Sequence, residues 1–285
     1  LGRGVMFRST LDLTTETISG GVSIQNPNYN FTGNSVFSSL FISTADRTES
    51  SGFKSSKSSF DLGTEFEIYE GVYFSPSFGV AYEDIEVQSS ASASMQKMEG
   101  TFTNADFDYG IVVDKRNEVY KPTAGYWYKF DQSIPLVLDS SSLTNGFKAR
   151  AYHAFSDDVT GIAKFYARTI NGIDEDVRVT KRLYLPQNRL RGFQTRRVGP
   201  KDGNDWVGGN YTTALGFEAL LPNLLPEASL TDISLFFDSG NVWSVDYSST
   251  VDDTNKIRSA AGIAANVYTV IGPLSFTLAQ DLSKY

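Results

Sequence analysis

Cysteine is absent from the 285 residues of this chain, so disulfide bonds and thiolate metal sites are both excluded. Long hydrophobic runs are also absent, and no window supplies the run of about 18 apolar residues that a membrane-spanning helix needs. A membrane β-barrel is still allowed, because a barrel strand crosses with about 9–11 residues, of which only every second one must be apolar. The hydrophobic fraction of 40% agrees with such a barrel.

Residues that carry chemistry are equally scarce. The only histidine, His153, lies between Tyr152 and Ala154 with no acid directly beside it. Outer-membrane hydrolases need a histidine near an acid or a serine, so a hydrolase is disfavoured. The sequence contains no metal-ligand cluster and no phosphate-binding loop, and we expect no catalytic residue, no metal and no cofactor. A formal net charge of −8 argues against nucleic acid as a partner.

A period of two runs through most of the chain. Between Ser59 and Tyr69 the even positions are mainly apolar, whereas the odd positions include Asp61, Glu65 and Glu67. Such alternation predicts strands with two unlike faces. About 14 strands are predicted, near residues 4–15, 17–26, 34–46, 55–69, 72–88, 103–114, 123–133, 146–156, 160–171, 178–186, 209–221, 230–238, 257–268 and 272–281.

Alternation alone fits either a soluble β-sandwich or an antiparallel transmembrane β-barrel. The barrel is favoured because so many successive hairpins are unusual for a sandwich, and because the polar faces carry mixed charges in mid-strand, as a wet lumen does. Aromatic residues also gather near strand ends, as girdles at a membrane interface require. These aromatic groups are Tyr69 with Tyr73, Tyr126 with Trp127 and Tyr128, and Trp243 with Tyr247.

A long loop between Arg189 and Asn210 is the strongest indication of function. It carries four arginines and one lysine, interleaved with glycines, a phenylalanine and a Gly-Pro turn. A loop of this length in a β protein is usually functional or disordered. Because basic residues are mixed with residues suited to packing, we expect the loop to dock on an acidic surface. Strand parity places Glu218 and Asp238 on the inner face of the two following strands.

From about Arg189 to Tyr285 the sequence resembles the Omp85 superfamily of outer-membrane proteins. A lone Arg-Gly-Phe would carry little information, but an ordered series of motifs with family-like spacing is specific. The series comprises Arg191-Gly192-Phe193, Val198-Gly199-Pro200-Lys201-Asp202, Val207-Gly208-Gly209-Asn210, Phe217-Glu218, and residues 236–243, 257–262 and 272–276. Earlier in the chain, residues 121–125 resemble the family's turn into its eighth strand.

The resemblance implies a 16-stranded barrel, with about 14 strands in this chain, and a long sixth loop folded into the lumen. We therefore expect residues 1–285 to form one Omp85-type barrel domain. The family's periplasmic POTRA domains have no matching pattern here. Its first and last strands are also expected to be missing, because residues 1–4 resemble the approach to the second strand and Tyr285 falls before the last one.

The resemblance also implies a site. The loop tip, Arg191-Gly192-Phe193, is expected to contact the inner wall, with Arg191 paired to both Glu218 and Asp238. Adjacent carboxylates repel each other unless a cation lies between them, and a guanidinium can bond both in fixed geometry. The alternative is a solvated basic loop with two ordinary lumen acids. Expected loop-support residues are Gly199, Pro200, Asp202, Gly208 and Gly209.

The function implied by the resemblance is the folding and insertion of β-barrel proteins into the bacterial outer membrane, with no covalent bond made or broken. Expected partners are unfolded outer-membrane β-barrel proteins, accessory lipoproteins and outer-membrane lipid. The alternative is a translocation or two-partner secretion pore of the same superfamily. A passive porin fits less well, because its constricting loop is usually the third one, and this loop lies late in the chain.

Overall fold

The computed structural model describes residues 4–138, 142–222, 224–226, 230–247, 251–253, 255–269 and 272–283. Thirteen strands form one antiparallel sheet, in the order β1 to β9 and then β12 to β15, and two short strands, β10 and β11, pair separately. Within these residues, no helix is long and apolar enough to cross a membrane. Leu1 to Arg3 and Tyr285, on which the expectation of missing strands depends, lie outside the described residues.

The strands of the large sheet are β1 (Met6–Leu13), β2 (Thr17–Asn26), β3 (Ser35–Arg47), β4 (Phe53–Tyr69), β5 (Val72–Val87), β6 (Gly100–Asp114), β7 (Ala124–Leu138), β8 (Ser142–Ser156), β9 (Val159–Gly172), β12 (Tyr211–Leu221), β13 (Thr231–Trp243), β14 (Arg258–Thr269) and β15 (Gly272–Asp281). The short pair is β10 (Lys201–Asp202) and β11 (Asp205–Trp206). The helical turns are α1 (Thr48–Ser51), α2 (Ala93–Gln96), η1 (Tyr29–Phe31) and η2 (Gln187–Arg189).

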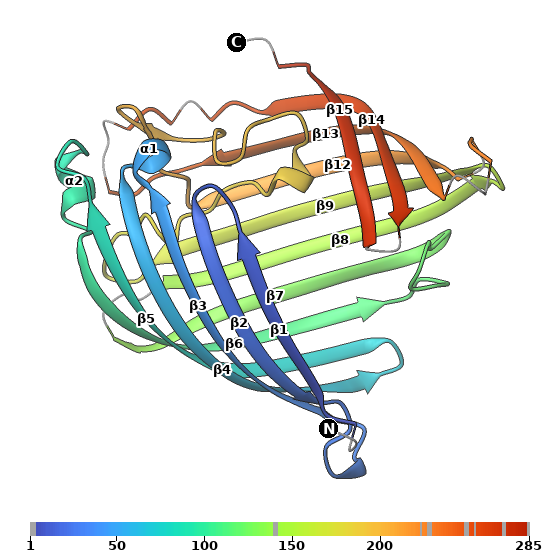
Figure 1. Cartoon of the computed structure of the whole chain (residues 1–285), viewed down its shortest axis with the longest axis horizontal. Coiled ribbons are helices and arrows are strands. Elements are labelled where there is room, and N and C mark those ends of the chain that lie inside the picture. Colours follow the sequence, from blue (N-terminus) through green and yellow to red (C-terminus); the bar gives the residue numbers. More distant parts are fainter. Residues whose placement is uncertain are drawn as a thin grey trace.

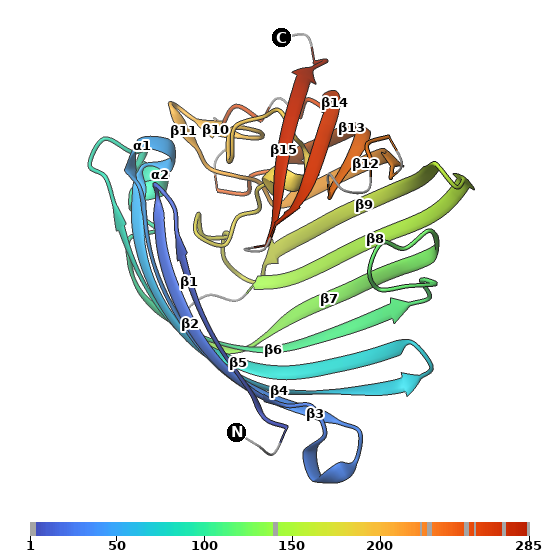
Figure 2. The same ribbon diagram turned by 45° about the vertical axis from the view of Figure 1, so that its right-hand side comes forward.

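The sheet curls around an interior that the segment between β9 and β12 occupies, drawn in yellow to gold in Figures 1 and 2. Each strand pairs with the next one in an antiparallel ladder, and β9 pairs with β12 across the loop. Among the described residues no ladder joins β1 to β15, so these two strands are the edges of the sheet. One continuous curved sheet rules out the sandwich alternative, which requires two stacked sheets.

The two faces of the sheet differ as the alternation predicts. On β12 and β13 the apolar side chains of Leu215, Phe217 and Leu235 are 47%, 53% and 49% exposed on the outer side of the sheet. Glu218 and Asp238 project to the opposite, inner side, where Asp238 is only 2% exposed. An apolar outer band and a polar interior are the arrangement of a barrel whose outside contacts lipid.

The connections lie at the two ends of the strands. At the short-turn end lie the two-residue turns 70–71 and 157–158 and the turn 115–123; at the other end lie α1, α2 and the loop 173–210. The second end is covered by a small apolar core. Its buried members are Phe53, Ile85, Ala91, Met95, Met98, Val179 and Val207, and Tyr247 packs against it. This core fixes the root of the long loop to α2 and β5.

Thirteen of the predicted segments are strands, but the strand predicted near 178–186 is wrong. The structure places these residues inside the loop, which begins at Ile173 rather than at Arg189. The backbone turns here, because the carbonyl of Arg178 accepts from the N–H groups of both Lys181 and Arg182. Residues of both parities are buried, so the apparent alternation comes from packing on several sides.

Two of the expected girdle aromatics have other roles. Trp127 lies on the lumen side, where the guanidinium of Arg150 is 5.8 Å from its ring centroid. Tyr247 packs on the apolar core that covers the long-loop end. In contrast, Tyr69 and Tyr126 are exposed on the outside, as a membrane-interface girdle requires.

Candidate functional site

The loop from Ile173 to Asn210 is first anchored by Arg182, whose side chain is fully buried. Its guanidinium donates to Asn210 Oδ1 at 3.0 Å, to the Val177 carbonyl at 2.7 Å and to Asp246 Oδ1. Asp246 Oδ2 accepts from Asn210 Nδ2 at 2.9 Å and from the Val177 N–H at 3.1 Å. One arginine therefore ties the two ends of the loop to the segment that follows β13.

Asp246 makes this anchor dependent on pH. Burial raises the pKa of Asp246, but the nearby Arg182 and the hydrogen bonds from Asn210 and Val177 more than offset burial, so the pKa lies below its usual value. A depressed carboxyl pKa stabilises the fold fully above the unfolded pKa of about 4. That stabilisation is lost as the pH falls through the lower, folded pKa.

We expect the free energy of unfolding in urea to decrease as the pH falls below about 4. An Asp246→Asn variant should be less stable at neutral pH and should lose the part of that dependence that Asp246 contributes, because its side chain no longer titrates. The measurement is Trp fluorescence of the detergent-solubilised protein at several pH values. Asp252→Asn, at an exposed nearby position, is the matched control. An unchanged acid dependence in Asp246→Asn would contradict the assignment.

Glycines let the middle of the loop lie against β13. Gly199 has φ +114, and a Cβ built on it would lie 2.8 Å from Val242 Cβ. Gly208 has φ +70, and a Cβ on Gly209 would lie 2.4 Å from the Trp243 carbonyl oxygen. A side chain at position 199 or 209 would push the loop off the barrel wall, and one at position 208 would collide with Leu183 and Tyr184 of the loop itself.

The other two expected support residues are also held in place. Pro200 is among the most deeply buried residues, and its carbonyl accepts from the Val207 N–H at 3.2 Å. Asp202 accepts from Tyr247 Oη at 2.9 Å and from the hydroxyl of Ser92, beside α2. The five support residues therefore bind the loop both to the wall and to the core that covers this end.

Apolar side chains hold the tip of the loop inside the barrel. The buried cluster consists of Leu185, Leu190 and Val198 from the loop and of Tyr166, Ala214 and Val242 from the wall, with Phe193 packed against it. Full burial of one such aliphatic side chain stabilises by about 1.5–3 kcal/mol. Buried apolar contacts therefore hold the tip in addition to its ion pairs.

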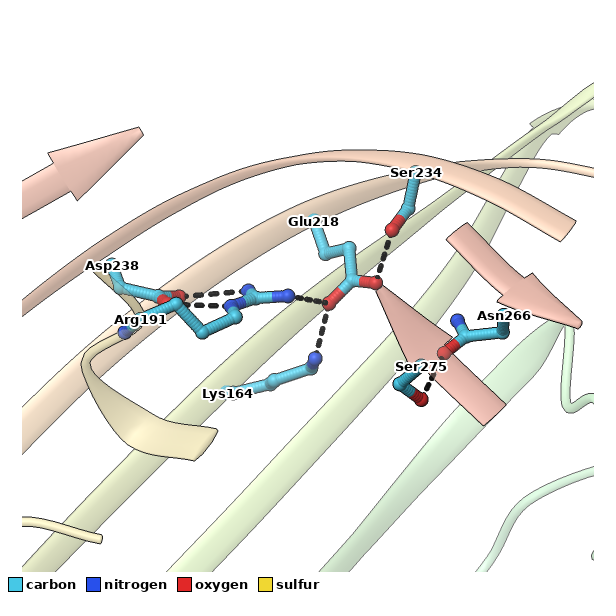
Figure 3. A network of polar contacts seen from close by, with 7 residues as sticks. All are labelled: Lys164, Arg191, Glu218, Ser234, Asp238, Asn266 and Ser275. Carbon is cyan, nitrogen blue, oxygen red and sulfur yellow. Dashed lines mark hydrogen bonds and ion pairs between the residues drawn. The ribbon is translucent and has the colours of Figure 1, made fainter. Parts of the chain in front are cut away.

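Arg191 pairs mainly with Asp238 on β13 (Figure 3). Its Nε lies 2.7 Å from Asp238 Oδ2 and its Nη2 lies 2.9 Å from Oδ1, which is a bidentate arrangement. The backbone N–H of Arg191 donates to the same carboxylate at 3.2 Å. The guanidinium also lies 3.6 Å from the ring centroid of Phe236, so the cation has an aromatic face beneath it.

Glu218 on β12 completes the network. Arg191 Nη1 reaches Glu218 Oε2 at 3.4 Å, a longer contact than either bond to Asp238. Lys164 of β9 donates to the same oxygen, and Ser234 Oγ donates to Oε1 at 2.6 Å. Figure 3 shows Arg191 and Lys164 approaching Glu218 from two sides. The two carboxylates thus have two cations, so this buried group is neutral as a whole.

Sequence reasoning identified Arg191, Glu218 and Asp238, which the structure brings together, but it missed three partners. Lys164 and Ser234 were not predicted as partners in the site, and Phe236 appeared only within the motif at residues 236–243. The parity signal was available for all three, because Ser234 and Phe236 share the inward parity of Asp238. Lys164 is opposite Gly216 in the β9–β12 register, two residue pairs from the level of Glu218 and therefore on the same face of the sheet.

The tip borders a lumen cavity of about 1190 Å³, which is also lined by Arg150, Lys164, Arg189 and the inner faces of β14 and β15. Arg189 lies over the ring of Tyr166, with 5.3 Å between its guanidinium carbon and the ring centroid. In the part of the chain that the structure describes, no group of three or more His, Cys, Asp or Glu residues could hold a metal ion.

A single antiparallel barrel sheet, apolar outside, with a long loop clasped in its interior, defines an integral outer-membrane β-barrel protein with an inward-folded loop. The Omp85 superfamily domain matches residues 1–285 of the chain. The chain belongs to the Omp85 superfamily and is a protein of the outer membrane.

Two curated relatives match at low identity. The outer membrane protein assembly factor BamA of Neorickettsia risticii is 23% identical over 255 residues, covering 86% of this chain and 34% of the relative. The human sorting and assembly machinery component 50 homolog is 24% identical over 169 residues, covering 55% of this chain and 36% of the relative. The chain thus spans about a third of the length of these relatives. Neither name denotes an enzyme.

Solved structures show the same fold. BamA from Haemophilus ducreyi lacking POTRA domains 1–3 matches with a TM-score of 0.86 at 20% identity, covering 100% of this chain and 62% of that one. CdiB from Acinetobacter baumannii matches with a TM-score of 0.55 at 10% identity, covering 98% of this chain and 56% of CdiB. The prediction of an all-β, antiparallel Omp85-type barrel is confirmed.

Proposed function

We propose that this barrel catalyses the folding and insertion of other β-barrel proteins into the bacterial outer membrane. The observation that carries the proposal is that the whole chain has the fold of a BamA barrel, with its inner loop clasped to β12 and β13 by Arg191. The substrates would be unfolded outer-membrane β-barrel proteins. Accessory lipoproteins and the surrounding lipid would be partners.

The mechanism would depend on sheet edges and needs no covalent chemistry. The seam of a barrel is the junction at which its first and last strands pair. Where this pairing is weak, backbone N–H and C=O groups are exposed, and an incoming chain can add strands to them. The C-terminal part of the sheet suits weak pairing, because β14 carries four alanines and one glycine among 12 residues. Such residues offer little cross-strand side-chain contact. A short apolar belt beside the seam would also thin the bilayer and ease insertion.

The bonds of Arg191 to Asp238 and Glu218 form what we call the clasp. Within this mechanism, the clasp would keep the barrel wall rigid while the seam opens. Arg191 joins the loop to two neighbouring strands, β12 and β13, that carry the C-terminal hairpin. A rigid support beside a weakly held edge would let strands be added without collapse of the lumen. The loop-support glycines would act with Arg191 by keeping the loop close to the wall.

Depletion of the protein in its native cells, followed by quantitative proteomics of the outer membrane, tests this function. General loss of β-barrel proteins is expected. Complementation with the wild-type gene should restore them, and Arg191→Ala should restore them poorly. Loss of a single secreted protein, with other barrels unchanged, would contradict the proposal and support the secretion pore. The likeness to CdiB, over 98% of this chain, is the observation in favour of that alternative.

A further inference from the structure

A second internal contact to β13 lies at the short-turn end, far from the Arg191 clasp. The turn between β6 and β7, residues 115–123, carries Lys121. Its Nζ lies 2.7 Å from Asp232 Oδ2 and 3.0 Å from Asp232 Oδ1. Asp232 is 5% exposed near the start of β13. Tyr268 of β14 donates its hydroxyl to Asp232 Oδ2 at 2.9 Å.

The contact crosses the mouth of the barrel rather than following the sheet. In the sheet, β8, β9 and β12 separate β7 from β13. Lys121 and Asp232 are also 111 residues apart in sequence. The ammonium group of Lys121 lies 4.7 Å from the ring centroid of Tyr268, so the lysine contacts both β13 and β14. The ring centroid of Tyr120 also lies 6.2 Å from that of Tyr268, so two adjacent residues of this turn join the middle strands to the C-terminal strands.

The turn is shaped to present this lysine. Lys121 has φ +50, a left-handed conformation that is strained for a non-glycine residue, and Pro122 follows it. Such strain persists only where the surroundings fix the conformation. Asn117 provides part of that support, because its Oδ1 accepts from the N–H groups of Thr123 at 3.1 Å and Ala124 at 3.0 Å.

We propose that Lys121 is a strap that fastens the short-turn ends of β13 and β14 to the middle strands across the barrel mouth. With the clasp at Asp238, β13 would be held from inside at two points six residues apart, about 20 Å along the strand. Movement of the C-terminal strands is thereby confined to β15 and the far end of β14. This division of the sheet into a fixed part and a movable part goes beyond the proposed function and does not depend on it.

Hydrogen exchange of the purified barrel in detergent, without any client, tests the strap. Lys121→Gln should raise the exchange rate at the start of β13 and the end of β14 about 5-fold, with little change in β3 to β5. The matched control is Lys115→Gln, which removes the other lysine of the turn. The side chain of Lys115 donates to the Glu70 carbonyl of the neighbouring turn at 2.6 Å. Unchanged exchange in Lys121→Gln, or equal changes in both variants, would overturn the proposal.

A double-mutant cycle separates the strap from general loosening of the turn. The effect of Lys121→Gln should vanish when Asp232→Asn is already present, because the partner charge is gone. Additive effects would count against the strap. Since the chain has no cysteine, a short bismaleimide can report the distance between the two positions. It should link Lys121→Cys to Asp232→Cys much faster than Lys115→Cys to Asp232→Cys, and equal rates would refute the proximity of the turn to β13.

Discussion

Replacing Arg191 by alanine is expected to destabilise the barrel by about 3–5 kcal/mol, because the change leaves a buried carboxylate without its cation. Asp238 is 2% exposed and takes two guanidinium bonds and one backbone bond from Arg191. Glu218 keeps Lys164 and Ser234 and is less affected. Urea unfolding of the detergent-solubilised protein gives the free energy, and complementation of depleted cells gives the activity.

Arg191→Lys refines this result. Lysine keeps the positive charge but cannot form the bidentate pair or lie flat over Phe236, so we expect an intermediate loss of stability. Arg197→Ala is the matched control, since Arg197 lies in the same loop and is exposed. A protein with Arg191→Ala that retains full assembly activity and an unaltered loop position would refute the role of the clasp.

Gly192→Ala should have the second largest effect. Gly192 has φ +90, and a Cβ on it would lie 2.9 Å from Ala279 Cβ and 3.6 Å from Ala260 Cβ. The added methyl group would meet both backbone strain and the inner faces of β14 and β15. We expect a loss of about 2–4 kcal/mol in the free energy of unfolding, together with faster hydrogen exchange in β15.

The control variant Gly203→Ala separates the effect of backbone strain from that of steric collision with Ala279. Gly203 lies in the same loop with φ +61, and a Cβ there would meet nothing within 4 Å. This control should lose only about 1 kcal/mol. Ala279→Gly, combined with Gly192→Ala, should recover part of the stability by removing the opposing methyl group. Equal losses for the two glycine variants, with no recovery, would show that the approach of the tip to β15 is unimportant.

Much of this architecture could be predicted from strand parity and motif order. Parity placed Phe217 and Leu235 outside and Glu218 and Asp238 inside, and the structure agrees because a strand reverses its side chains at every residue. The same reasoning failed at 178–186, where Arg178, Val179, Arg182 and Leu183, residues of both parities, are buried within a turning loop. Alternation of apolar and polar residues indicates which side chains are buried. A loop that is packed on several sides can therefore show the same alternation as a strand.

The sequence alone determined the class of fold, the inward acids and the arginine that meets them, because all three follow from local periodicity and short motifs. Only the tertiary structure decided that Asp238 takes the bidentate pair while Glu218 shares Lys164. It also brought Arg182 to Asp246 and Lys121 to Asp232. These pairs join residues 64 and 111 positions apart. Their proximity depends on how far the sheet curls and how deep the loop lies, and no local pattern encodes either quantity.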